Sequence, residues 1–263
     1  MPGLRGLLSD LTYQALRLRR AASPELRVLM YHRVTDAHPD DRLCVSVVHF
    51  EAQMRFLHEA GYRTVTVADA VRLAEGRGTS AGKAVAITFD DGYEDNFLSA
   101  APTMARYGFT GCFFVPTQFI ESDANRYTLA DRPMGWEQLM GLLQSGHEVG
   151  AHSVKHVELT KLGAEAMRWE VEHSKAVLEQ RLGRPVDFFC YPRGAYNAQV
   201  KAAVQAAGYR GACSVEPGAV QPGADPFTLR RTEVSAFDSL WDFEKKLAGA
   251  YDWMHAAVQV MKR

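Results

Sequence analysis

The sequence predicts an α/β protein in which parallel strands close into a barrel. From residue 27 almost to its end, the chain alternates short runs rich in β-branched and aromatic residues with longer helical patterns. Seven or eight such units in a row favour a parallel sheet or barrel over a fold that separates strands from helices. Polar clusters follow several strands, and (β/α) barrels assemble their sites at the C-terminal ends of several strands. We therefore prefer a closed barrel to an open sheet.

The individual elements follow from composition and periodicity. Strands are predicted at residues 27–31, 63–67, 84–89, 112–115, 148–151, 188–191 and 211–214, and a weaker one at 228–234. Apolar residues at helical spacing predict helices at residues 50–60, 68–74, 96–107, 136–144, 164–182 and 198–207, and a last one from residue 240. Glycine follows five of these helices, as is typical of helix ends, at Gly61, Gly108, Gly146, Gly183 and Gly208. No glycine-rich phosphate loop follows the first strand, which argues against a dinucleotide-binding fold.

Composition bounds the class of protein. The 263 residues are enough for one large domain, and the formal net charge of -1 gives no reason to expect a nucleic-acid partner. The four cysteines are far apart, and three of them lie in apolar runs. We therefore expect reduced, buried thiols and no disulfide framework.

Residues 1–22 form a separate N-terminal segment, predicted to be an amphipathic helix ahead of a domain that spans 23–263. The residues of its apolar face are Leu4, Leu7, Leu8, Leu11, Ala15 and Leu18, and its positive charges are Arg5, Arg17, Arg19 and Arg20. The helix either packs on its own domain or lies on an anionic membrane as a peripheral contact. Neither a signal peptide nor a membrane-spanning stretch is visible, so the expected location is cytoplasmic, at most peripheral to the inner membrane.

Two motifs carry chemistry. The predicted strand 84–89 ends in Asp90-Asp91-Gly92, and the predicted strand 148–151 ends in His152, with His156 four residues later. One carboxylate and two imidazoles suit zinc and leave positions open for water and substrate. The spare carboxylate could then take a proton from that water, which indicates a metal-dependent hydrolase. The alternative is that the aspartates only form a turn or helix entry.

These motifs resemble a known family. Thr88-Phe89-Asp90-Asp91-Gly92, His152-Ser153-Val154-Lys155-His156 and Phe189-Cys190-Tyr191-Pro192-Arg193-Gly194 look like the first three motifs of the polysaccharide deacetylases (NodB-homology, carbohydrate esterase family 4). The resemblance implies a distorted (β/α)7 barrel, with residues 23–263 as the catalytic domain. It also implies removal of N-acetyl groups from a glycan or glycan precursor that contains N-acetylhexosamine.

Roles for individual residues follow from the resemblance. Asp91, His152 and His156 would hold a divalent metal, most simply Zn²⁺, with Ni²⁺, Co²⁺ or Fe²⁺ as alternatives. Asp90 would be the general base that deprotonates the metal-bound water. The oxyanion would be stabilised by the metal and by a backbone N–H of the Pro192-Arg193-Gly194 segment. The residues expected at the substrate are Tyr191, Pro192, Arg193, Gly194 and Arg231.

The chain departs from the family pattern at two places. The family usually has an arginine where Cys190 stands, and either Arg193 or Arg231 would have to supply its charge. The family's general acid is usually a histidine in a late Leu-x-His motif, which is absent near this C-terminus. Instead His32 ends the first strand, as in the branch of poly-N-acetylglucosamine deacetylases, and we expect it to be the acid in preference to His255.

Three function classes remain after these observations. The first is an N-deacetylase of a cytosolic or lipid-linked N-acetylhexosamine glycan precursor, and the second is a C–N amide hydrolase on a non-sugar substrate. The third is a catalytically silent carbohydrate-binding member of the fold. The expected base and all three expected ligands are present, which favours an enzyme over the third class.

Overall fold

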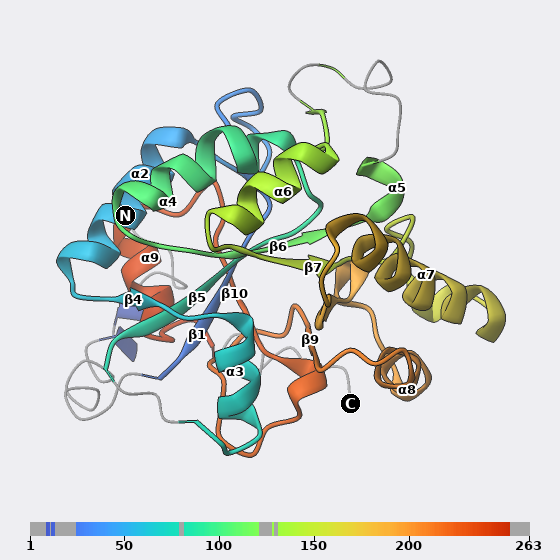
Figure 1. The fold of residues 1–263 in the computed structure, drawn as a ribbon. Helices are drawn as coiled ribbons and strands as arrows, with labels where there is room; N and C mark the ends of the chain where they lie inside the picture. Colours follow the sequence, from blue (N-terminus) through green and yellow to red (C-terminus); the bar gives the residue numbers. More distant parts are fainter. Residues whose placement is uncertain are drawn as a thin grey trace.

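The computed structural model describes residues 9, 10, 12, 13, 25–78, 82–120, 128 and 131–252. Strands and helices alternate along the chain (Figure 1). The strands are β1 (Arg27–Tyr31), β2 (Arg33–Val34), β3 (Cys44–Val45), β4 (Arg63–Thr64), β5 (Ala84–Phe89), β6 (Cys112–Val115), β7 (Glu148–Ala151), β8 (Phe188–Cys190), β9 (Gly211–Cys213) and β10 (Thr232–Glu233). The α-helices are α2 (Val47–Glu59), α3 (Val67–Ala74), α4 (Ala101–Arg106), α5 (Thr117–Ile120), α6 (Trp136–Gln144), α7 (Ala164–Leu182), α8 (Ala198–Ala206) and α9 (Leu240–Leu247).

The main sheet is parallel and curls until its two edges nearly meet. Its strand order is β10-β1-β5-β6-β7-β8-β9, and β4 pairs with the beginning of β5. The segment 229–233 links the edges, because Leu229 forms a parallel bridge with Cys213 in β9 and Thr232 pairs with Leu29 in β1. Helices cover the outside of this curved sheet (Figure 1). The fold is therefore the distorted (β/α) barrel that the sequence predicts.

Strand residues face two different cores, as alternation along a strand requires. One set packs outward against α2, α4, α6, α7, α8 and α9. The other set points into the barrel and meets, among the helices described, only α3. The inward set includes Val28, Ala84, Ala86, Cys112, Phe114, Phe188, Cys190, Cys213 and Leu229. Small inward side chains leave room for polar groups near the strand ends.

Several predicted boundaries were too long, for local reasons. The strand predicted at 63–67 ends at Thr64, because Thr66 caps α3 in a reciprocal capping box with Asp69. Only Thr232 and Glu233 of the strand predicted at 228–234 join the ladder. The helix predicted at 96–107 begins as a π-helical turn, Asn96–Ala100, before α4. The short elements β2, β3 and α5 were not predicted.

The N-terminal segment is described at only four positions, and the rest of 1–22 lies outside the described residues. Ser9 and Tyr13 are buried against α9, where Lys245 Nζ donates to Ser9 Oγ and the Tyr13 ring packs edge-on against Trp241. At these positions the contacts agree with packing on the domain. All four cysteines are buried and free, as expected. Within the described part of the chain, no helix has the length and apolarity to cross a membrane.

Candidate active site

Asp90 lies inside the barrel, directly after β5. Asp90 is 3% exposed, and its carboxylate accepts two hydrogen bonds of 2.7 Å from Arg231, one to each oxygen. Arg231 also donates to Thr88 Oγ1 and to the carbonyl of Ser214, so the guanidinium is fixed from three sides. Burial raises the pKa of Asp90, but Arg231 outweighs it and holds that pKa below its ordinary value. The structure thus pairs Arg231 with Asp90, whereas Arg193 is exposed.

Asp91 reaches the same side of the barrel through a left-handed turn. A regular strand would point Asp91 away from Asp90, but its φ is 72° and that of Gly92 is 68°. Asp91 Oδ1 then lies 3.4 Å from His152 Nε2 and 3.2 Å from His156 Nε2. Burial raises the pKa of Asp91, but the two imidazoles outweigh it and hold that pKa far below its usual range. Both carboxylates therefore stay ionised beside each other.

The two imidazoles come from the loop that follows β7. His152 is 2% exposed, and its Nδ1 donates to the carbonyl of Cys190 over 2.7 Å, which leaves Nε2 as the free nitrogen. Burial lowers the pKa of His152, but Asp91 outweighs it and raises the pKa above its ordinary value. Ser153 Oγ accepts the backbone N–H of His156, so the loop folds back on itself. The centres of the two imidazole rings are 4.8 Å apart.

Asp91, His152 and His156 fit a divalent cation. Each offers one ligand atom, and these atoms lie within 4.8 Å of one another. Asp91 Oδ1 is buried and has no hydrogen-bond partner in the part of the chain that the structure describes, which is unusual for a buried carboxylate oxygen. A ligating histidine that donates its other N–H to a carbonyl, as His152 does, is the common arrangement in metal sites. The cluster can therefore bind a metal without rearranging its hydrogen bonds.

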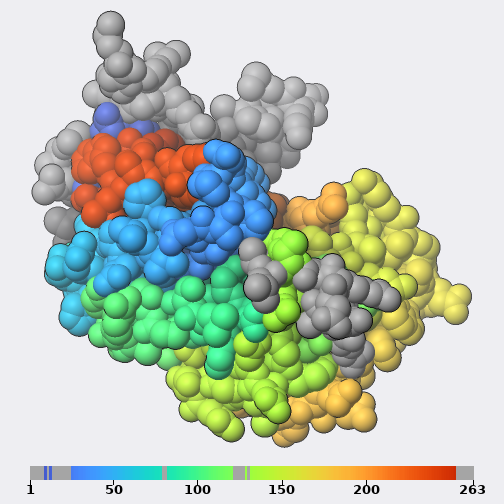
Figure 2. Space-filling view, turned by 90° about the horizontal axis from the view of Figure 1, so that it is seen from above, coloured from blue at the N-terminus to red at the C-terminus, as the bar shows by residue number. Residues whose placement is uncertain are grey.

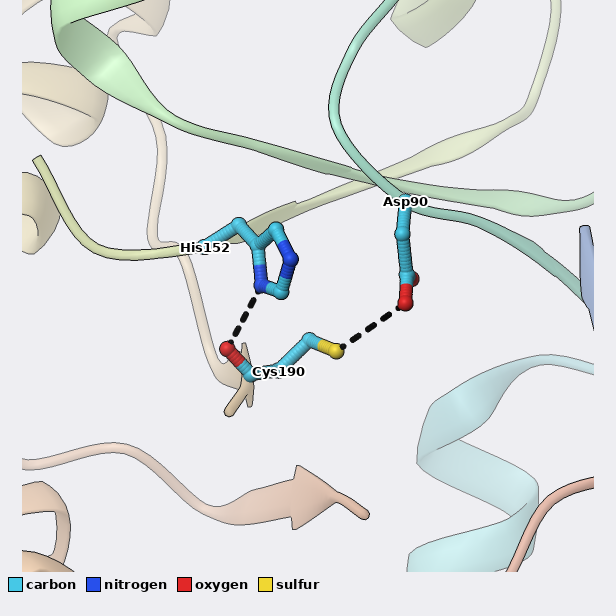
Figure 3. Close-up of side chains that lie close together, drawn as sticks. All are labelled: Asp90, His152 and Cys190. Atoms are coloured by element: carbon cyan, nitrogen blue, oxygen red, sulfur yellow. Dashed lines mark hydrogen bonds between the residues drawn. The ribbon is translucent and has the colours of Figure 1, made fainter. Parts of the chain in front are cut away.

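A second group, Asp90, His152 and Cys190, is equally close but suits a metal less well (Figure 3). Both oxygens of Asp90 are bound by Arg231, and Cys190 Sγ lies 3.5 Å from Asp90 Oδ2. Burial raises the pKa of the Cys190 thiol well above its ordinary value, which disfavours the thiolate that a metal needs. Cys190 instead fills the space beside the ion pair, with Sγ 3.0 Å from Arg231 Nη2.

His32 follows β1, and Asp90 follows β5, the neighbouring strand in the sheet. Tyr31 pairs with Phe89 in the sheet, and the N–H of Asp90 donates to the carbonyl of Tyr31. A charged His32 lowers the pKa of both Asp90 and Asp91, so its imidazole acts on both carboxylates. Its Nδ1 is buried and has no hydrogen-bond partner among the described residues. His255, the competing acid, lies outside the described residues.

The third motif forms a tight 3₁₀ turn, Pro192–Gly194, after β8. The first N–H groups of a helical turn have no partner within it, and Pro192 has no N–H, so the Arg193 N–H is the first available donor. The expectation for Tyr191 is not met by its side chain. Tyr191 is fully buried, its hydroxyl donates to the carbonyl of Phe227, and its N–H donates to the carbonyl of Cys213. Tyr191 alternates with Cys190 and therefore faces the helices.

Backbone strain is concentrated in these motifs. The described residues other than glycine with positive φ are Asp91, Ser153, His156 and Arg193. Such conformations cost of order 1–3 kcal/mol each and persist only where the surroundings enforce them. All four belong to the three motifs, so the fold stabilises a backbone here that the chain would not adopt alone.

Sequence reasoning missed one buried charge next to the site. Glu170 of α7 is 3% exposed and accepts the N–H groups of Val154 and Lys155, both at 2.9 Å. The signal was present in the sequence, because Glu170 falls on the apolar stripe of α7 between Met167 and Val171. A lone charge on a buried helix face indicates a specific partner.

A parallel barrel with a buried ion-paired carboxylate, a second carboxylate and two imidazoles at its strand ends defines a hydrolase-type site. Comparisons with known proteins identify a family within this class. Residues 77–212 match the family model described as polysaccharide deacetylase. The Bacillus subtilis protein named "Putative polysaccharide deacetylase YxkH" is 30% identical over 211 residues, which cover 80% of this chain and 72% of that protein.

Solved structures agree with the sequence match. IcaB from Ammonifex degensii is 25% identical with a TM-score of 0.76, covering 86% of this chain and 98% of that one. The deacetylase PplD of Streptococcus pyogenes, solved in complex with acetate, shares the fold at 21% identity and a TM-score of 0.76, covering 85% of this chain and 98% of that one. The chain belongs to the polysaccharide deacetylase family (NodB-homology, carbohydrate esterase family 4), and its class is that of the deacetylase hydrolases.

Proposed function

We propose that this protein is a metal-dependent N-deacetylase of a glycan or glycan precursor that contains N-acetylhexosamine. The observation that carries the proposal is the cluster of Asp91, His152 and His156, with ligand atoms within 4.8 Å of one another, beside the ion-paired Asp90. A water activated at such a cluster needs a neighbouring base, and Asp90 is the adjacent carboxylate. Membership of the family supports the acetamide as the group attacked.

Different residues would carry out different parts of the reaction. Asp91, His152 and His156 would hold the cation, which when bound would polarise the acetamide carbonyl and lower the pKa of a coordinated water. Asp90 takes a proton from the attacking water. Arg231 keeps Asp90 ionised and fixed, while an ionised carboxylate has about four lone-pair directions and so retains acceptor capacity. The carbonyl carbon is attacked as the oxyanion accepts the Arg193 N–H.

Collapse of the tetrahedral intermediate breaks the C–N bond. The leaving amine must be protonated as it departs, and His32 supplies that proton. The buried Nδ1 of His32 supports this role, because none of the described residues forms a hydrogen bond with it. The products are acetate and a free amino sugar.

The physical form of the substrate is a separate proposal. Arginines among the leucines of residues 1–22 support a peripheral contact with an anionic membrane and hence a lipid-linked substrate at the inner membrane face. Cell fractionation of the native protein is the measurement. Recovery of all the protein in the culture medium would count against this placement.

Acetate release tests the activity. The assay uses a panel of N-acetylglucosamine oligomers and simple non-sugar acetamides, with metal-depleted protein before and after addition of Zn²⁺, Co²⁺ or Ni²⁺. We expect release from the sugars only after metal is restored, and none from Asp91→Ala. The exposed Asp40→Ala is the control and should match wild type. Release only from non-sugar acetamides would favour the general amide hydrolase, and metal-independent release would refute the metal site.

A further inference from the structure

The buried carboxylate of Glu170 contacts the backbone of the loop that carries His152 and His156. We propose that Glu170 is a positioning residue, which sets the affinity of the candidate metal site from α7 without contacting the metal or the substrate. The inference rests on the proposed function for the identity of the site. Independent support comes from the backbone conformation of residues 152–156 and from the buried Glu170 carboxylate that contacts this backbone.

The loop between the two histidines needs external support. Ser153 has a φ of 63° and His156 a φ of 56°, so two residues with side chains occupy the left-handed region within four positions. The carbonyls of Ser153 and Val154 accept the N–H groups of Thr117 and Gln118. These bonds hold one edge of the loop, but they leave the N–H groups of Val154 and Lys155 directed elsewhere.

Both of those N–H groups converge on one atom, Oε2 of Glu170, each at 2.9 Å. Successive N–H groups that meet at a single point form an anion-binding concavity, and here the anion is a side chain of the same protein. Hydrogen bonds to an ionised acceptor are shorter and roughly twice as strong as neutral ones. Glu170 therefore fixes the turn that separates His152 from His156.

The charge of Glu170 has no other compensation. The side chain is 3% exposed, and no cation lies within ion-pair distance of it in the described part of the chain. It is the one charged residue in the buried stripe of α7, where its neighbours are Met167, Val171, Ser174 and Leu178. An unpaired buried carboxylate is costly, so the two N–H groups are what make this position tolerable for Glu.

The consequence concerns metal affinity. His152 and His156 must place their Nε2 atoms at a common distance from Asp91, and these lie at 3.4 and 3.2 Å from Oδ1. If the loop relaxes out of its left-handed turns, the two nitrogens no longer converge. Loss of a partner that orients metal ligands typically costs 10–100-fold in affinity. Truncation of Glu170 should cost about that much.

The test compares four variants by metal affinity, measured without substrate by competition of Zn²⁺ with a chromophoric chelator. Glu170→Ala should bind roughly 10–100-fold more weakly than wild type. Glu170→Gln, whose amide oxygen can still accept both N–H groups, should recover most of that loss. Val171→Ala, a buried truncation on the same helix, should lower the melting temperature but leave the affinity unchanged. The exposed Glu172→Ala should change neither.

Hydrogen exchange of the metal-free protein provides a second readout. The amides of Val154 and Lys155 should exchange faster in Glu170→Ala and at the wild-type rate in Val171→Ala. Wild-type affinity and unchanged exchange in Glu170→Ala would overturn the inference, as would equal affinity losses in Glu170→Ala and Val171→Ala. Asp91→Ala separates the two proposals: if it keeps its metal, the proposed metal site itself fails, and this inference fails with it.

Discussion

At the scale of single residues, the ion pair of Asp90 and Arg231 dominates the site. Arg231 is 1% exposed and Asp90 3%, so neither charge is solvated by water. Breaking such a pair from one side leaves a buried charge without compensation, which typically costs 3–5 kcal/mol. Each of these two buried charges therefore needs the other to compensate it.

We predict that Arg231→Met lowers the free energy of unfolding by about 3–5 kcal/mol at pH 7. In wild type the folded Asp90 has a pKa below its unfolded value, so its contribution is present above the ordinary carboxyl range and is lost as pH falls through the folded pKa. In the variant the attraction of Arg231 is gone, and burial, the largest influence on this carboxyl, should raise the pKa of Asp90 above the unfolded value. The deficit should therefore begin to shrink as pH falls through the raised pKa of Asp90 in the variant. It should shrink further below the ordinary carboxyl range, as Asp90 of wild type is protonated in turn.

Urea unfolding at pH 7 and near pH 4 is the measurement. The neighbouring Arg230→Met is the control, because Arg230 is exposed and should cost within about 0.5 kcal/mol at either pH. A deficit that is constant with pH would mean that lost packing, and not the charge of Asp90, explains the effect.

A second residue-scale prediction separates His32 from the other histidines. If His32 protonates the leaving amine, His32→Ala should retain its metal and lower kcat on an N-acetyl sugar by roughly 10²–10⁴. The loss should be much smaller for an aryl acetate ester, whose leaving group departs without a proton. His255→Ala should be nearly silent in both assays. The opposite pattern, with His255 essential and His32 dispensable, would place the acid at the C-terminal end.

Alternation along strands explains which residue roles could be predicted. His32, Asp90 and His152 extend the inward-facing positions of β1, β5 and β7, so their convergence follows from period-two patterning. The same rule places Tyr191 outward, because it alternates with the inward-facing Cys190. The choice between Arg193 and Arg231 could not be made in this way. It depends on how the segment 229–233 crosses between β9 and β10.

At the scale of elements, long runs with strong composition were predicted well and short ones were not. The bounds of β1, β5, β6, β7, α6 and α7 agree with prediction, because each is a complete buried run or a complete helical period. β2 and β3 have two residues each and pair with each other through the register of Arg33 with Cys44, which no local pattern indicates. The turns around the motifs matter more, because they carry the proposed base and the proposed metal ligands.

The turn after β5 gives an element-scale prediction. Gly92 has a φ of +68°, and an added Cβ would lie 2.8 Å from Val115 Cγ1. Val115 pairs with Ala151, and its carbonyl accepts the N–H of His152. A shift of Val115 would therefore displace two proposed metal ligands, Asp91 beside Gly92 and His152 after β7. We predict that Gly92→Ala loses most of its bound metal and activity while the barrel stays folded.

Gly61→Ala is the matched control. Gly61 has a φ of +76°, but nothing lies within 4 Å of its added Cβ. Both variants incur the left-handed penalty of about 1–2 kcal/mol, whereas only Gly92→Ala displaces Val115. Metal content by atomic emission and the melting temperature are the measurements. Equal metal content in the two variants would show that the turn tolerates a side chain and does not set the position of Asp91.

At the scale of the whole molecule, the barrel closes through few contacts. Segments from early and late in the chain lie side by side (Figure 2). Here α2 and α9 meet through the rings of Phe56 and Phe243. The ladder of β10 with β1 is only two residues long. The number of units and their closure into a barrel could be predicted from the sequence. The residues that pair at the closure could not, because they join segments about 200 residues apart by so few hydrogen bonds.

The last prediction concerns metal removal from the whole molecule. The strands and helices enclose two large apolar clusters that do not involve the proposed metal ligands. Chelation should therefore leave the barrel folded with an unchanged far-ultraviolet circular dichroism spectrum. The stability lost is the linkage free energy, about 4 kcal/mol when free metal had been 1,000-fold above its dissociation constant. For a domain of this size, that corresponds to roughly 8–16 °C in melting temperature. Acetate release should vanish and return with added Zn²⁺, and Asp91→Ala should melt at the same temperature with or without chelator. If chelation unfolds wild type completely at 25 °C, the cation is required for folding, and the prediction that the barrel folds without it is wrong.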